Sequence, residues 1–161
     1  MEGPRIEELT PGAKTLGALL ALERACFSVP WRETDFEQAL QSDLYRVFGC
    51  YEGETLVGFT VFFTIYEVCE LMNLAVAPDA RRAGIGGALL RTCLEQASEA
   101  GAERVLLEVR EHNAPAIALY EKSGFRRFGR RRNYYRLPVE DALLYFKDIQ
   151  RTKSEKDTSS C

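Results

Sequence analysis

Histidine and closely spaced cysteines are nearly absent from this chain of 161 residues. The only histidine is His112, and the five cysteines contain no Cys-x-x-Cys pair. They stand at Cys26, Cys50, Cys69, Cys93 and Cys161. A zinc site needs closely paired Cys and His residues, and a disulfide scaffold needs a much denser set of cysteines. We therefore predict no metal site, and reduced thiols in a cytoplasmic protein.

Long hydrophobic runs are missing as well. The longest apolar-rich stretch without a charge spans residues 56–66, whereas a membrane-spanning helix needs ~18–20 apolar residues. The opening residues, MEGPR, contain no apolar segment of the kind found in a secretory signal. We expect a protein that neither crosses a membrane nor is exported.

An excess of positive charge is confined to one segment. Lys and Arg total 21 against 24 Asp and Glu, a formal net charge of −3. Between residues 126 and 136 no acid occurs, and the segment contains Arg126, Arg127, Arg130, Arg131, Arg132 and Arg136. The acidic total argues against direct nucleic-acid binding. The arginine run is either an anion-facing or partner-facing patch or the solvated face of a strand.

Composition and length indicate one globular domain. Hydrophobic residues make up 46% of the chain and charged residues 28%, as is typical of soluble globular proteins. The length matches a single domain of ~100–200 residues. We predict one domain over residues 1–150 and a flexible polar tail over residues 151–161.

Hydrophobic periodicity predicts a mixed α/β fold with the element order β-α-α-β-β-β-α-β-α-β-β. Strands are expected at residues 6–9, 45–51, 56–68, 70–76, 105–109, 125–132 and 143–146. Helices are expected at residues 11–27, 34–40, 85–100 and 115–122. Thr10 is the predicted cap of the first helix, with Pro11 at its first position. The helix at 85–100 connects two strands and requires at least one parallel pair.

The segment RRAGIGGA, residues 81–88, lies between a predicted strand and the start of a predicted helix. Its glycines allow backbone N–H groups to approach a ligand, and the helix N-terminus and arginines supply positive charge. The segment therefore favours a phosphate or pyrophosphate. It is not a dinucleotide fingerprint, because Leu89 stands where the third glycine belongs, and no Gly-Lys-Ser/Thr of a P-loop follows. A plain glycine turn that caps a helix is the alternative.

Longer motifs carry a family resemblance. The segment NLAVAP at 73–78, followed by Arg81-x-x-Gly84-x-Gly86, resembles the acetyl-CoA motif of the GNAT N-acetyltransferase superfamily. The segments LEVR (107–110), NAPAIALY (113–120), GF (124–125) and RRNYY (131–135) are similar to its branch of RimI-type ribosomal-protein-alanine N-acetyltransferases. So are CFSVPW (26–31) and EDA (140–142). The resemblance covers about residues 5–148.

The resemblance implies a GNAT fold, which is a central twisted mixed sheet of about seven strands flanked by about four helices. Two middle strands would splay apart and hold acetyl-CoA between them. The pantetheine would pair with the backbone of Leu74, Ala75 and Val76. The pyrophosphate would meet Arg81, Arg82, Ala83, Gly84, Ile85, Gly86 and Gly87. Asn113 resembles a further cofactor-binding position, although it also fits the start of a helix.

Two residues are candidates for the proton transfers. Glu108 is a carboxylate in an otherwise apolar strand, and an unpaired buried carboxylate is costly. By resemblance Glu108 is the general base, acting through a water, and Tyr120 is the general acid. From the residues alone, Glu108 could instead be an outward strand residue paired with an arginine, and Tyr120 a core aromatic. His112 matches no catalytic position of the family and is interpreted as a solvated loop residue.

Three aromatic residues are the candidates for binding the acceptor. By resemblance Trp31, Tyr134 and Tyr135 lie in loops over the acceptor and would clamp a peptide N-terminus, although packing aromatics are the alternative. The leading hypothesis is a cytoplasmic enzyme that acetylates the N-terminal alanine of a small-subunit ribosomal protein. The alternatives are an acetyltransferase for other protein N-termini or a small-molecule amine, and a non-catalytic acyl-CoA-binding module.

Overall fold

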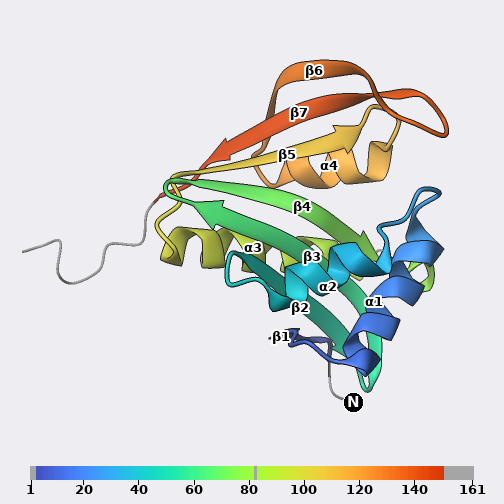
Figure 1. Ribbon diagram of the computed structural model, residues 1–161. Helices are drawn as coiled ribbons and strands as arrows, with labels where there is room; N and C mark the ends of the chain where they lie inside the picture. The colour runs from blue at the N-terminus through green and yellow to red at the C-terminus, as the bar shows by residue number, and fades with distance from the viewer. Residues whose placement is uncertain (1–2, 82, 151–161) are drawn as a thin grey trace, which may run out of the picture.

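The computed structural model describes residues 3–81 and 83–150. Arg82 and the predicted flexible tail at 151–161 lie outside the described residues. Seven strands form one sheet in the order β1-β2-β3-β4-β5-β7-β6. Helices α1 and α2 lie over one face of the sheet, and α3 and α4 lie over the other (Figure 1). Within the described ranges, no helix is long and apolar enough to cross a membrane.

The element order matches the predicted order. The strands are β1 (Arg5–Glu8), β2 (Tyr45–Glu52), β3 (Thr55–Ile65), β4 (Val68–Val76), β5 (Arg104–Arg110), β6 (Arg126–Tyr135) and β7 (Glu140–Asp148). The helices are α1 (Ala13–Cys26), α2 (Glu33–Gln41), α3 (Ile85–Glu99) and α4 (Ala114–Lys122), with a 3-10 turn η1 (Pro78–Ala80).

Several predicted boundaries were wrong, including the end of β6, which is Tyr135 and not residue 132, and the start of β7, which is Glu140 and not residue 143. Helix α1 begins at Ala13, not at Pro11, because the Leu9 N–H donates to the Val47 carbonyl at 2.8 Å and keeps the chain extended beyond β1. The strand predicted at 56–68 ends at residue 65. Tyr66 has a left-handed φ of 54° and turns the chain there, a turn that no glycine or proline marks.

The central feature is a split between β4 and β5. The two strands pair in parallel only from Val68–Arg104 to Leu71–Leu107, which confirms the predicted parallel pair. On β3, Val61 pairs with Asn73 and Phe62 with Leu71, so Met72 is an extra residue in β4. Such a bulge bends its strand. Beyond it β4 and β5 diverge (Figure 1), as expected for the GNAT fold.

Two apolar layers hold the strands on either side of the split. On one face, Leu19 and Phe36 of α1 and α2 pack with Phe59 and Val61 of β3. On the other, residues of α3 and α4 pack with Val105, Leu107 and Val109 of β5. Because side chains alternate along a strand, Glu108 and Arg110 project to the same face as α1 and α2. The packing therefore decides which side of the sheet each candidate residue reaches.

Candidate active site

Glu108 lies at the point where the split opens. It is the first residue of β5 beyond the last pair with β4, and its side chain is 33% exposed. Its Oε1 lies 3.1 Å from Arg131 Nε. A hydrogen bond to the Glu108 carboxylate raises the pKa of Tyr134. In the free protein Glu108 is thus paired with an arginine, as one of the two interpretations of the sequence expected, and it also borders the split.

Tyr120 approaches from the opposite face of the sheet. It projects from α4, is 7% exposed, and packs edge-on to Phe125 at a ring distance of 5.8 Å. Burial raises the pKa of Tyr120, and the neighbouring Cys93 and Tyr135 raise it further. The phenol therefore keeps its proton throughout the ordinary pH range.

Tyr135 affects, or is affected by, the charges of both candidate residues, Glu108 and Tyr120. Burial and, next, the Glu108 carboxylate raise the pKa of Tyr135 to about 12. Tyr135 in turn contributes to the raised pKa of Tyr120. Tyr135 on β6 thus interacts electrostatically both with Glu108 on β5 and with Tyr120 on α4.

The open edge of β4 presents backbone groups to the split. The Ala77 N–H donates to Val57 on β3 at 2.8 Å. Because backbone groups alternate in direction along a strand, Ala75 also faces β3, whereas Leu74 and Val76 face the open side. The Val76 carbonyl accepts hydrogen bonds from Arg81 Nε at 3.2 Å and from Cys26 Sγ at 3.3 Å. Of the three predicted pantetheine positions, Leu74 and Val76 are the two whose backbone N–H and C=O groups point toward the open side of β4.

The glycine segment forms the start of α3. Gly84 is the N-cap, with a left-handed φ of 77°. A Cβ at Gly86 would lie 3.2 Å from Leu119 Cδ2 and 3.7 Å from Val76 Cγ2, so this glycine allows α3 to pack closely on α4 and β4. The first N–H groups of a helix lack intrahelical acceptors and carry partial positive charge. Those of Ile85, Gly86 and Gly87 are suited to an anion.

Asn113 and His112 have local roles in the free protein. The Asn113 side-chain oxygen accepts from the Ala116 N–H at 3.3 Å and caps α4, which is the helix-start interpretation. The His112 side chain is 82% exposed. Its Nδ1 lies 3.1 Å from Glu140 Oε2. His112 is therefore at the surface, as expected.

Sequence reasoning missed a buried carboxylate near Trp31. Glu23 is 2% exposed. Its Oε1 accepts from the Trp31 N–H at 3.1 Å, and its Oε2 accepts from Asn73 Nδ2 at 2.8 Å. Burial raises the pKa of Glu23. Glu23 ties the α1–α2 loop to β4, and its place on the apolar stripe of α1, beside Leu19 and Leu20, was the available signal.

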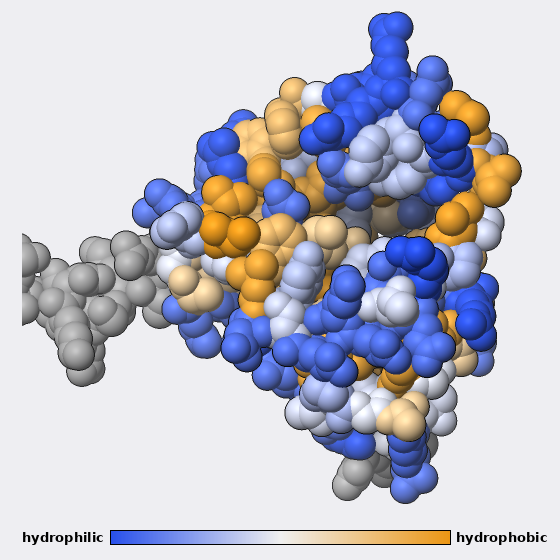
Figure 2. Space-filling model, viewed as in Figure 1, coloured by the Kyte–Doolittle hydropathy of each residue, from blue (hydrophilic) through white to orange (hydrophobic). Residues whose placement is uncertain are grey.

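Two loops flank a hollow on the face of the molecule that carries α1 and α2 (Figure 1 and Figure 2). Figure 2 shows apolar side chains over the α1–α2 loop and over the β6–β7 loop, with the hollow between them. Trp31, in the first loop, packs its ring 5.2 Å from Phe36. Tyr134 and Tyr135, at the end of β6, lie ring to ring at 5.1 Å and 84°. Trp31 is thus partly a packing residue, whereas Tyr134 is 49% exposed.

Two of the six arginines in the predicted patch, Arg130 and Arg131, form ion pairs with acids of the described residues. Arg130 Nη1 lies 2.7 Å from both Glu111 and Asp141, and Arg131 pairs with Glu108.

Among residues 3–81 and 83–150, no group of three or more His, Cys, Asp or Glu side chains is arranged to hold a metal ion.

Comparison with known proteins defines the class. Residues 16–125 match the model of the Acetyltransferase (GNAT) family. The chain therefore belongs to the GNAT acetyltransferases, which confirms the predicted fold and enzyme class.

Particular relatives agree with the predicted branch. The chain is 36% identical over 131 residues to the [ribosomal protein bS18]-alanine N-acetyltransferase of Escherichia coli K12, covering 80% of this chain and 88% of the relative. It is 33% identical over 129 residues to a putative enzyme of the same name from Bacillus subtilis, covering 80% and 85%. The crystal structure of the Escherichia coli ribosomal-protein-S18-alanine N-acetyltransferase superposes with a TM-score of 0.85 at 32% identity, covering 95% and 98%.

Proposed function

We propose that the protein transfers the acetyl group of acetyl-CoA to the N-terminal alanine of ribosomal protein bS18 in the cytoplasm. The observation that carries this proposal is the position of Glu108 at the point where β4 and β5 diverge. The similarity over most of the chain to bS18-alanine N-acetyltransferases supports the choice of acceptor.

The residues around the split fit acetyl-CoA. Leu74 and Val76 present backbone groups toward the open side, and the α3 N-terminus presents N–H groups and positive charge. Acetyl-CoA supplies an activated thioester there. Arg81 and Cys26 both donate to the Val76 carbonyl in the free protein, so a pantetheine N–H that pairs with this carbonyl has to displace one of them or share the oxygen with them.

Glu108 is the proposed general base. An α-amine has an ordinary pKa of ~7.7–8.0, so part of it is neutral near pH 7. Glu108 attracts the amine and removes its proton, directly or through a water. Arg131 competes for the same carboxylate, so the incoming amine has to share or replace this ion pair.

Tyr120 is the proposed general acid for the departing thiolate. Its raised pKa lies above the ~8.5 of an ordinary thiol, which by itself opposes full proton transfer. Apolar surroundings also raise the pKa of a thiol, because they disfavour the thiolate. Tyr120 therefore first donates a hydrogen bond to the sulfur, and the proton follows as charge builds there.

Mass spectrometry tests the acceptor. The protein is incubated with acetyl-CoA and a peptide that begins with the alanine-starting sequence of bS18, and fragmentation locates the acetyl group. The control peptide has a blocked N-terminus and one internal lysine, whose neutral fraction at pH 7 is ~300-fold smaller than that of an α-amine. Acetylation of the free α-amine alone supports the proposal. Efficient acetylation of polyamines or aminoglycosides, with the alanine peptide unmodified, would replace it with a small-molecule acceptor.

A further inference from the structure

The loop at residues 136–139 joins β6 to β7 and follows directly after Tyr134 and Tyr135. Its side chains Leu137 and Val139 are 77% and 66% exposed, so apolar packing does not hold it in place. We propose that Arg110 is a positioning residue that clamps this loop and thereby holds Tyr134 and Tyr135 in place for acceptor binding. The inference about the acceptor rests on the proposed function.

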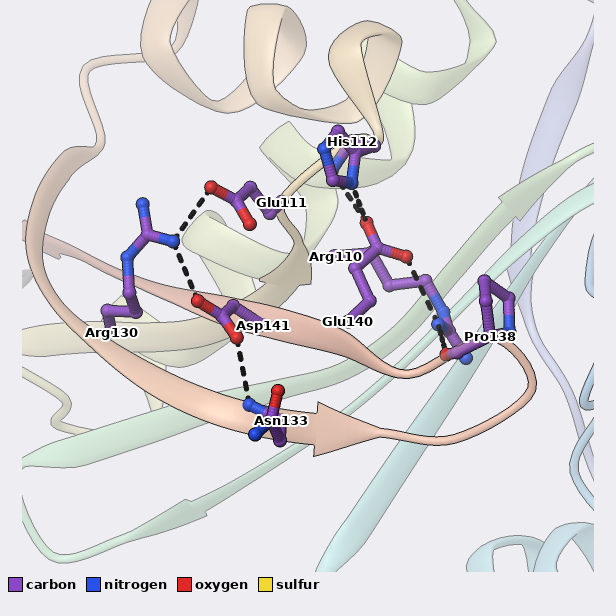
Figure 3. Close-up of polar contacts among 8 residues, drawn as sticks. All are labelled: Arg110, Glu111, His112, Arg130, Asn133, Pro138, Glu140 and Asp141. Atoms are coloured by element: carbon purple, nitrogen blue, oxygen red, sulfur yellow. Dashed lines mark hydrogen bonds and ion pairs between the residues drawn. The ribbon is translucent and has the colours of Figure 1, made fainter.

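One guanidinium makes three bonds across the loop. Arg110 Nη1 donates to Glu140 Oε1 at 3.2 Å and to the Pro138 carbonyl at 3.4 Å. Arg110 Nη2 donates to the Arg136 carbonyl at 3.3 Å. Within the described part of the chain, neither carbonyl accepts a hydrogen bond from another group. Figure 3 shows Arg110 reaching from the end of β5 to Glu140 and Pro138.

The Arg110 guanidinium also stacks on the ring of Tyr135. The Arg110 guanidinium carbon lies 4.3 Å from the centre of the Tyr135 ring, within the range of a cation–π contact. The Tyr134 ring packs perpendicular to Tyr135, and the guanidinium carbon of Arg131, which pairs with Glu108, lies 5.7 Å from the centre of the Tyr134 ring. A chain of contacts thus runs from Arg110 through the two tyrosines and Arg131 to the proposed base.

The clamp is itself anchored. The Glu140 side chain is only 9% exposed. Its Oε2 accepts from the His112 N–H at 2.7 Å, so Arg110 is held against a carboxylate bonded to the segment that leads into α4. The adjacent Asp141 accepts from the Asn133 N–H at 2.8 Å. Asp141 thus fixes the chain at Asn133, just before the tyrosines, and Glu140 anchors the arginine that binds the loop after them (Figure 3).

Only an arginine can satisfy these contacts together. Its planar fork reaches several acceptors and stacks on a ring, whereas a lysine ammonium is a point charge on a flexible stem. Arg110→Lys should therefore fail to restore what Arg110→Ala removes. An ordinary ion pair between Arg110 and Glu140 would be largely restored by lysine.

Arg104 is a matched control on the same strand and the same face. Its Nε lies 2.7 Å from Asp148 Oδ1 of β7, and its guanidinium carbon lies 4.8 Å from the centre of the Phe146 ring. It thus combines a carboxylate of β7 with an aromatic ring, as Arg110 does, but at the far end of β5 from the loop. Arg104→Ala should change neither loop order nor acceptor binding.

The experiment measures loop order and kinetics on the full chain. In Arg110→Ala and Arg110→Lys, amide order parameters at Leu137 and Val139 should fall from the ~0.85 of rigid backbone toward values below ~0.6. The KM for an alanine-starting peptide should rise roughly tenfold, in line with the loss of hydrogen bonds to a charged group. The KM for acetyl-CoA should change less than about twofold.

Unchanged order parameters in a folded Arg110→Ala would overturn the clamp. An unchanged peptide KM beside a mobile loop would overturn the link to acceptor binding. Equal effects in Arg104→Ala would show a general loss of stability instead. If the wild-type protein acetylates no peptide, the proposed function fails separately, and the order parameters still decide whether Arg110 holds the loop.

Discussion

Glu108 and Arg131 form an ion pair, with Arg131 Nε 3.1 Å from Glu108 Oε1, although β7 lies between their strands. The pair is possible because Glu108 is opposite Leu144, and Arg131 is opposite Ala142. Alternate residues of β7 place both side chains on one face. The proposed base is therefore held by a cation in the free protein, and an amine that approaches it meets a carboxylate already oriented.

Glu108→Gln should lower turnover by roughly 10²–10⁴-fold, because the amide keeps the shape but cannot accept the proton. Binding of acetyl-CoA, measured by calorimetry, should not change. Glu111→Gln is the matched control, since Glu111 is also half-exposed and paired with an arginine of β6. Near-wild-type turnover in Glu108→Gln would reduce Glu108 to a structural partner of Arg131.

Tyr120→Phe should also lower turnover by roughly 10²-fold or more while leaving the free energy of unfolding nearly unchanged. Among the described residues, no hydrogen bond to the Tyr120 hydroxyl is present that the substitution would remove. Tyr145→Phe is the contrasting control, because the Tyr145 hydroxyl donates to Glu121 at 2.8 Å. That variant should lose about 1.5–3 kcal/mol of stability, as expected for a hydrogen bond to a charged group, and keep its turnover. If Tyr120→Phe instead kept its turnover and lost stability, Tyr120 would have a structural role and would not be the general acid.

Gly86→Glu should abolish binding of acetyl-CoA. A side chain there starts 3.2 Å from Leu119 Cδ2 and brings a negative charge to the N-terminus of α3, where an anion is expected. Calorimetry on the folded variant measures the affinity. In the control Gly17→Glu, on α1, an added Cβ meets no atom within 4 Å, and the substitution should leave binding intact. Unchanged affinity in Gly86→Glu would exclude this loop from the cofactor site.

Glu23 should make stability depend on pH. Burial raises its pKa above the 4.5 of an ordinary glutamate, so between these two values the folded protein binds more protons than the unfolded chain. The free energy of unfolding should therefore fall as pH rises through that window and level off above the raised pKa. Urea unfolding at a series of pH values measures this slope.

Glu23→Gln should flatten that pH dependence, because an amide does not titrate. Exposed Glu95→Gln is the control and should keep the wild-type slope. An identical slope in Glu23→Gln and the wild type would mean that other groups cause the pH dependence.

Several features of the site could be predicted because they are local in the chain. The glycines at 84–87 predicted the start of α3, and the motifs around Glu108 and Tyr120 carried the family resemblance. Boundaries were predicted less well where distant contacts decide them. The start of α1 depends on the bond between Leu9 and Val47, which local periodicity does not contain.

The sequence by itself determined the element order, the parallel pair and the residue types available for chemistry, because these follow from local periodicity and from turn and cap preferences. Only the tertiary structure decided how they are combined. The bulge at Met72 opens the split, and the ion pair of Glu108 with Arg131 and the clamp of Arg110 on the β6–β7 loop follow from strand order. The physical reason is that sheet register and packing join residues from separate strands, and no local pattern specifies which of several arginines meets which carboxylate.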